Sequence, residues 1–248
     1  LIVMNEDEDL RDCAKYAGVS LKASFYMRHK IMNAMVNEMK NKQLEGIVEI
    51  DEMSINISYS GNHKKHNEVE MPRNPYYRGR KGHVFSKDTE ITDNIIVATA
   101  VDRQGNIFTK VAKIGTTILD VDTIKNIYGP HLKKATTLCT DGLMSYKLLA
   151  KEINVDHKAF PTKSKEKRGI YHINNVNYIH SKIKEYFRNH NGISSKYLDE
   201  YLALISYRLG NKLRTIEDYF IDLYTSLCTF RRKNYIGTGF ITDGLSLG

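Results

Sequence analysis

The chain has 248 residues, 41% of them hydrophobic and 27% charged, which is enough to bury one sizeable core beside a small accessory domain. Its formal net charge of +8 favours a polyanionic partner, above all nucleic acid, although many basic chains bind nothing specific. Three cysteines without a C-x-x-C pair argue against a disulfide framework or structural zinc, and apolar runs of only strand length argue against a membrane or secreted protein.

The first expected element is a pair of helices between residues 9 and 39, where apolar residues recur at helical spacing. Gly18 supplies the turn between them, and Ser20 is the expected N-cap of the second helix, residues 21–40. The pair is typical of a helix-turn-helix, and the alternative is a helical hairpin that packs on the core. The basic residues of the second helix that we expect to contact DNA are Lys22, Arg28 and Lys30.

A β-rich region follows, with strands expected at residues 46–57, 94–102 and 107–114. The Asp102-Arg103-Gln104-Gly105-Asn106 segment has the composition of a hairpin turn, so the three strands form an antiparallel meander. The insertion between the first two strands, residues 58–93, is rich in basic and polar residues and is expected to be a surface loop. Its candidate DNA contacts are Arg78, Arg80 and Lys81.

Helices and strands then alternate, which predicts an α/β mixed sheet. The expected elements are a helix at 121–132, a strand at 135–140, a helix at 144–153 and a strand at 157–160. From residue 174 the pattern is helical to about 224, with a break near 189–194. We therefore expect three parts: a helix-turn-helix segment at 1–44, a catalytic domain at 45–212, and a C-terminal helical extension with a loose tail at 213–248.

Two aspartates stand where carboxylates would be costly without a partner or a metal ion. Asp51 lies within the first strand, which is otherwise suited to burial, and Asp141 ends the fourth. If these strands are neighbours, the two side chains converge and can share divalent cations, which is phosphoryl-transfer chemistry. Taken singly, each aspartate is more often a cap or turn residue.

The helix that begins near residue 174 has two faces. An apolar stripe of Val176, Ile179, Ile183 and Phe187 is expected to face the core. The polar stripe can border the two aspartates, or it can be an ordinary solvated face; it consists of Asn177, His180, Ser181, Lys184 and Arg188. His172 and His180 could donate hydrogen bonds to phosphate, although a helix-start or surface position is the more common role.

These segments together resemble insertion-sequence transposases with the ISXO-like domain, a group of the DDE superfamily in which the third acidic residue is sometimes asparagine, followed seven positions later by lysine. The matching segments are Val48-Glu49-Ile50-Asp51-Glu52, Thr140-Asp141-Gly142, and His172-x-Asn174-x-Val176-Asn177 with Lys184. The helix-turn-helix and the Arg78-Gly79-Arg80-Lys81-Gly82 loop are also similar, so that the resemblance extends from about residue 9 to residue 212.

The resemblance implies an α/β ribonuclease H-like fold, in which the antiparallel meander is joined by two further strands and flanked by helices. It also implies that Asp51, Asp141 and Asn177 hold Mg²⁺ or Mn²⁺, as two ions, and that Lys184 approaches the DNA. Asparagine offers a neutral carbonyl oxygen where glutamate offers a charge, so one metal site should be weaker.

The implied activity is strand cleavage at transposon ends, followed by attack of the freed 3′ hydroxyl on target DNA. The implied partners are double-stranded DNA, as terminal repeats and as target, and a second copy of the chain on that DNA, in the bacterial cytoplasm at the nucleoid. Phosphates would be held by basic residues whose alternative role is a solubilising surface: Lys163, Lys165, Lys167, Arg168, Lys182 and Arg188. Rival functions are a catalytically inactive, transposase-derived DNA-binding protein and another ribonuclease H-like nuclease.

Overall fold

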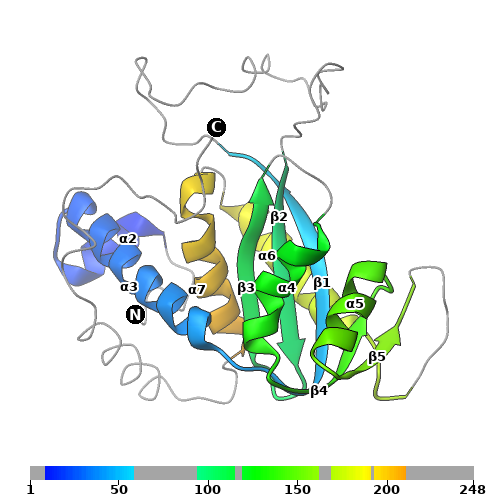
Figure 1. Ribbon diagram of the computed structural model, residues 1–248. Helices are drawn as coiled ribbons and strands as arrows, with labels where there is room; N and C mark the ends of the chain where they lie inside the picture. The colour runs from blue at the N-terminus through cyan, green and yellow to red at the C-terminus, as the bar shows by residue number, and fades with distance from the viewer. Residues whose placement is uncertain (1–8, 59–93, 115–118, 162–168, 191–192, 211–248) are drawn as a thin grey trace, which may run out of the picture.

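A computed structural model describes residues 9–58, 94–114, 119–161, 169–190 and 193–210 (Figure 1). Several predictions from the sequence lie outside these residues. They concern almost all of the basic insertion and the C-terminal extension at 213–248. The candidate DNA contacts outside the described residues are Arg78, Arg80, Lys81, Lys163, Lys165, Lys167 and Arg168.

The two N-terminal helices are α2 (Leu10–Ala17) and α3 (Leu21–Asn41), as the sequence predicts. Ser20 caps α3, since its hydroxyl accepts the Ala23 backbone N–H at 3.2 Å. Gly18 ends α2 with φ of 63°, in the left-handed region that a residue with a Cβ enters at a cost. Gly18 and Ser20 therefore determine where α2 ends and where α3 begins.

A five-stranded sheet with the order β3-β2-β1-β4-β5 forms the centre of the fold (Figure 1). The strands are β1 (Glu45–Asn56), β2 (Asn94–Asp102), β3 (Ile107–Ile114), β4 (Lys134–Thr140) and β5 (Asp156–Ala159). β1, β2 and β3 pair antiparallel, whereas β4 pairs parallel with both β1 and β5. The predicted meander and the two further strands are confirmed, and β1 and β4 are neighbours, the condition under which Asp51 and Asp141 converge.

The β2–β3 hairpin is held by the side chain of Asp102, which is 1% exposed. Its Oδ1 accepts the backbone N–H groups of Gln104 and Asn106, both at 2.9 Å. An aspartate that binds the backbone of its own turn is a common turn initiator. The predicted hairpin turn is confirmed.

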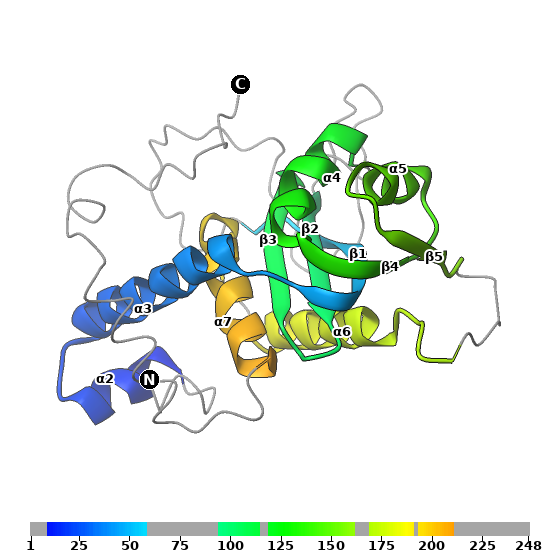
Figure 2. The same cartoon turned by 60° about the horizontal axis from the view of Figure 1, so that its bottom comes forward.

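Helices cover both faces of the sheet, as the two views show (Figures 1 and 2). One face is covered by α4 (Val121–Tyr128) and α5 (Met144–Glu152), together with the end of α3. The other face is covered by α6 (Asn174–Asn189). Helix α7 (Leu198–Gly210) packs along the edge strand β3 and contributes side chains to the cores on both faces.

The helix expected at 121–132 is shorter than predicted. α4 ends at Tyr128, and a 3₁₀ turn, η1 (Gly129–His131), takes the chain to β4. Pro130 is the reason, since proline has no backbone N–H to donate and its ring disfavours continuation of the helix. A second short 3₁₀ turn, η2 (Ser195–Tyr197), precedes α7, close to the predicted break.

The C-terminal half of α3 belongs to the same core as the sheet. Met32, Met35 and Met39 are buried in the core beneath α4 and α5. The buried side chain of His29 also contacts the buried side chain of Glu200 in α7. Helix α3 therefore packs on the central domain along much of its length. The second alternative, a helical hairpin packed on the core, is therefore present, and a DNA-binding helix-turn-helix stays a prediction.

Candidate active site

Asp51 lies on β1, and Asp141 is the first residue after β4, the neighbouring parallel strand. The β1–β4 register pairs Glu49 with Cys139, so Asp51, two residues further along β1, lies next to the end of β4, where Asp141 stands. Residues two apart in a strand point to the same face, so Asp51 lies with Met53 on the face covered by α6. Their proximity appears in the electrostatics, because the charge of Asp141 raises the pKa of Asp51.

The turn after β4 fixes the position of Asp141. Gly142 adopts φ of 97°, and a Cβ at this position would lie 3.3 Å from the Cβ of Ala159. The Leu143 backbone N–H donates to Asp141 Oδ1 at 3.1 Å, and the Gly142 N–H donates to the Thr140 hydroxyl at 3.1 Å. Glycine is therefore needed both for the conformation and for the close approach of β5.

Asp51 is a half-buried carboxylate with a raised pKa. Burial, with a smaller contribution from Asp141, raises the pKa of Asp51 to about 6, while the backbone N–H of Glu52 and the charge of Lys184 oppose the rise. A carboxylate whose charge is disfavoured by burial and by a neighbouring negative group is suited to bind a cation, which would offset both effects. Among the described residues, no group of three or more His, Cys, Asp or Glu side chains could hold a metal ion.

Helix α6 brings Lys184 and His180 toward the aspartates. The charge of Lys184 acts on Asp51, and His180 Nδ1 lies 3.7 Å from Asp51 Oδ2. Asn177 is exposed and lies one turn before His180 and two turns before Lys184, on the same side of the helix. The structure therefore brings Asp51, Asp141 and Lys184 together and places Asn177 on the helical face that borders them.

His180 differs from the expected surface histidine, since it is 7% exposed and its Nε2 has no hydrogen-bond partner among the described residues. Burial, with a smaller contribution from Lys184, lowers the pKa of His180 to about 4, so the imidazole is neutral at pH 7. His172 stands at the start of α6, as expected, with its ring next to Glu49.

Glu52 lies on the other face of the sheet from Asp51, as the alternation of a regular strand predicts. Its side chain faces Tyr146 of α5, and burial raises the pKa of Glu52 to about 7, with Tyr146 opposing the rise and the two aspartates adding to it. Tyr128, fully buried, links α4 to the sheet on this face, because its hydroxyl donates to the Asp51 carbonyl oxygen at 3.2 Å.

A protein-family profile described as the ISXO2-like transposase domain matches residues 43–210, well over half of the chain. The chain belongs to this transposase family. The match begins just before β1 and ends with α7, so it spans the whole sheet and both candidate aspartates. Together with the strand order, it confirms the predicted ribonuclease H-like fold.

Two solved structures are similar at low sequence identity. One is an intasome of simian T-cell lymphotropic virus in complex with PP2A regulatory subunit B56 gamma, at 11% identity and a TM-score of 0.38, covering 82% of this chain and 71% of that one. The other is the Mos1 strand transfer complex, at 13% identity and a TM-score of 0.31, covering 93% and 77%. No curated protein sequence matches the chain significantly.

The candidate DNA contacts of this transposase differ in accessibility. Lys22, Lys30 and Arg188 are exposed. Lys182 is half-exposed and donates to Glu185 at 2.8 Å. Arg28 is turned inward, with Nη2 at 2.9 Å from Cys13 Sγ, so it contributes to the α2–α3 packing.

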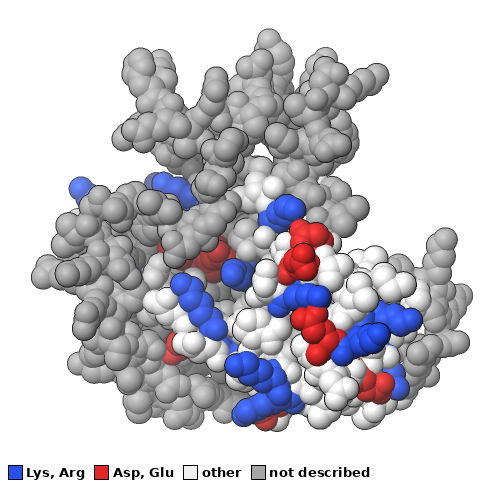
Figure 3. All heavy atoms as spheres, in the orientation of Figure 1, with Lys and Arg blue, Asp and Glu red and all other residues white. Residues whose placement is uncertain are grey.

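Acidic and basic side chains are interleaved on the face of the transposase domain that carries α4 and α5 (Figure 3). Two ion pairs there are Lys113–Asp120, at 3.4 Å, and Lys125–Glu152. A face on which the charges are paired offers phosphates little net attraction. The candidate active site lies on the opposite face of the sheet, together with Lys184.

The most buried acidic residue near the site, Glu49, has no role in the sequence-based prediction. Glu49 is fully buried and binds Arg103 of the hairpin turn and the first turn of α6. The sequence did indicate that Glu49 is paired. A carboxylate two residues before Asp51 must lie on the same face of the strand and must find a partner there. The partner itself, 54 residues away, has no local signature.

No described helix is long and apolar enough to span a membrane.

Proposed function

We propose that the protein is a DDE-type transposase that cleaves DNA at transposon ends and joins the freed ends to target DNA. The observation that carries the proposal is that Asp51 on β1 and Asp141, directly after the neighbouring parallel strand β4, lie close enough for the charge of one to raise the pKa of the other. Membership of the ISXO2-like transposase family supports the same reaction class. The substrates are double-stranded terminal repeats and target DNA, and a second copy of the chain would hold the second end.

Asp51, Asp141 and the Asn177 side-chain oxygen are the groups that would hold divalent cations, Mg²⁺ or Mn²⁺. The donor set fits, since hard cations prefer carboxylate and amide oxygens, and a bound cation would stabilise the charged form of Asp51, which burial disfavours. Two bound cations would supply a water activated for attack and charge stabilisation at the leaving oxygen of the phosphodiester. With only two carboxylates in the set, binding should be weaker than with three.

The remaining contribution of the protein is to position the DNA strands. Lys184 is exposed beside Asp51, where its ammonium group can hold a phosphate of the scissile strand. His180, buried and neutral at pH 7, packs beside Asp51, with Nδ1 3.7 Å from Oδ2. Lys22, Lys30, Lys182 and Arg188 would hold DNA phosphates outside the site, together with the basic residues at 78–81 and 163–168.

The test is incubation of the purified protein with a labelled duplex that ends in the element's terminal repeat, with Mn²⁺ or Mg²⁺. We expect nicking at the repeat boundary by the wild type, and none by Asp51→Ala or Asp141→Ala. DNA binding that persists in EDTA without any nicking would indicate an inactive, transposase-derived DNA-binding protein. Cleavage of structured substrates without joining would indicate another ribonuclease H-like nuclease.

A further inference from the structure

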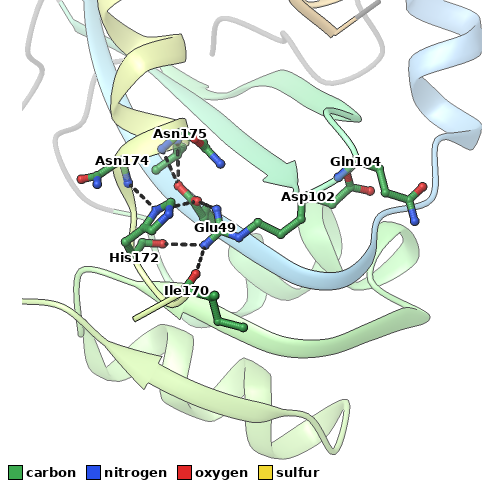
Figure 4. A network of polar contacts seen from close by, with 9 residues as sticks. Glu49, Asp102, Gln104, Ile170, His172, Asn174 and Asn175 are labelled. Carbon is green, nitrogen blue, oxygen red and sulfur yellow. Dashed lines mark hydrogen bonds and ion pairs between the residues drawn. The ribbon is translucent and has the colours of Figure 1, made fainter. Parts of the chain in front are cut away.

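Glu49 lies at the centre of a polar network between β1 and the start of α6 (Figure 4). Its side chain is fully buried. One carboxylate oxygen, Oε2, accepts the backbone N–H groups of Asn175 at 2.8 Å and Val176 at 3.0 Å. The other, Oε1, accepts from Arg103 Nη1 and lies 3.2 Å from His172 Nδ1. Both oxygens are therefore engaged, by groups from two different parts of the chain.

Within the described residues, helix α6 has only one local capping contact, in which His172 Nδ1 accepts the Asn174 backbone N–H at 3.3 Å. Ile173 occupies the N-cap position and offers no side-chain hydrogen bond, and the first turn contains no acidic residue. The first backbone N–H groups of a helix have no partner within the helix, and a carboxylate there gains charge-assisted hydrogen bonds and a favourable interaction with the helix dipole. β1 thus supplies, through Glu49, the acceptor for the Asn175 and Val176 N–H groups, which His172 does not reach.

Arg103 extends this contact to the segment that leads into α6. Its Nη2 donates to the carbonyl oxygens of Ile170 at 2.8 Å and His172 at 3.4 Å. The same guanidinium group therefore neutralises Glu49 and holds the backbone just before the helix. Since Arg103 belongs to the β2–β3 turn, the start of α6 is fixed to two separate points of the sheet.

These contacts lie close to the candidate site on both β1 and α6, so they should affect the reaction. Glu49 and Asp51 are two residues apart on β1 and share a face, about 7 Å along the strand. Asn177 directly follows Val176, and Lys184 lies eight residues beyond Val176, about 12 Å along the helix. The strand that carries Asp51 therefore also determines where the helix with Asn177 and Lys184 begins.

We infer that Glu49, held by Arg103, is a positioning residue that fixes α6 against β1 so that Asn177 and Lys184 face the Asp51–Asp141 pair. The inference rests on the proposed function for its effect on the reaction, but not for its effect on α6. A shift of about 1 Å in a reacting group can cost about 100-fold in rate. Loss of the network should therefore reduce strand cleavage far more than it reduces DNA binding.

The test compares the full-length variants Glu49→Gln and Arg103→Lys with a matched control, Glu45→Gln. Glu45 lies on the same strand, and its ion pair with Lys134 is at the surface. We expect Glu49→Gln to increase hydrogen exchange across the first two turns of α6 at least tenfold and to slow cleavage 10- to 100-fold, with DNA affinity within twofold of the wild type. Arg103→Lys, the milder change, should give smaller effects in the same direction, and Glu45→Gln should give none.

A double-variant cycle separates positioning from a general loss of stability. If Glu49 acts through Asn177, then Asn177→Ala should slow cleavage less in the Glu49→Gln protein than in the wild type. Additive losses, or exchange at α6 equal to that of Glu45→Gln, would overturn the inference. So would parallel losses of cleavage, DNA affinity and melting temperature in both Glu49→Gln and Arg103→Lys. If the wild type does not cleave at all, the proposed function fails, and hydrogen exchange alone decides whether Glu49 positions α6.

Discussion

Replacement of Asp51 by asparagine should stabilise the metal-free protein above pH 6, although it removes a proposed metal ligand. Burial, with repulsion from Asp141, raises the pKa of Asp51 from 3.8 to about 6. As pH rises from about 4 to 6, the unfolded chain therefore loses this proton before the folded protein does, and the wild type loses stability across that window. A shift of about 2 pKa units corresponds to about 3 kcal/mol, which is an upper limit because the side chain is 19% exposed.

The measurement is urea unfolding in EDTA at pH 4 and pH 8. At pH 8 we expect Asp51→Asn to be more stable than the wild type by about 2 kcal/mol, and at pH 4 the two should be nearly equal. Added Mn²⁺ should reverse the order at pH 8, because only the wild type retains both carboxylates. The control is Asp120→Asn, which removes an exposed carboxylate whose pKa is lowered to about 2, and it should bring no gain at pH 8. Equal stability of Asp51→Asn and wild type at pH 8, or a difference that persists unchanged at pH 4, would refute the reasoning.

Three further changes test other parts of the structure. Lys184→Ala should raise the pKa of Asp51 above 6, so Mn²⁺ titrations should show the onset of binding at higher pH than in the wild type. An unchanged pH profile would show that the charge of Lys184 does not reach Asp51. Tyr128→Phe should cost about 1–3 kcal/mol in urea unfolding, because the buried Thr99 N–H loses the hydroxyl that accepts it at 3.1 Å; a neutral result would show that this bond contributes little. Gly18→Ala should cost about 1 kcal/mol in the same assay, from backbone strain alone, since a Cβ there meets nothing within 4 Å; a gain in stability would contradict the left-handed turn.

The elements of the fold were largely predictable from the sequence because their signals are local. β2 and β3 begin and end at the predicted residues, since the apolar run of β2 stops at Asp102 and apolar residues resume at Ile107. The turn between them is determined by Asp102, which binds the backbone of its own turn. The end of α4 was missed, although the proline at position 130 was visible in the sequence.

The candidate site was predictable only in part. Asp51 and Asp141 were identified from carboxylates in or at the end of buried strands, and the resemblance to a transposase family added their order along the chain. Their proximity required the first and fourth strands to be neighbours, which depends on the pairing of segments 90 residues apart. The metal-binding role of these residues and of Asn177 stays a prediction.

What the sequence determined by itself was the set of helices and strands, their caps and turns, and the residue types available for the chemistry. These follow from interactions between residues a few positions apart. The tertiary structure alone decided that His180 is buried beneath Asp51, that Arg28 turns inward, and that Glu49 caps a helix 126 residues away. Such contacts depend on which side chains the folded sheet brings together, and a buried charge selects its partner from all of them rather than from its neighbours in sequence.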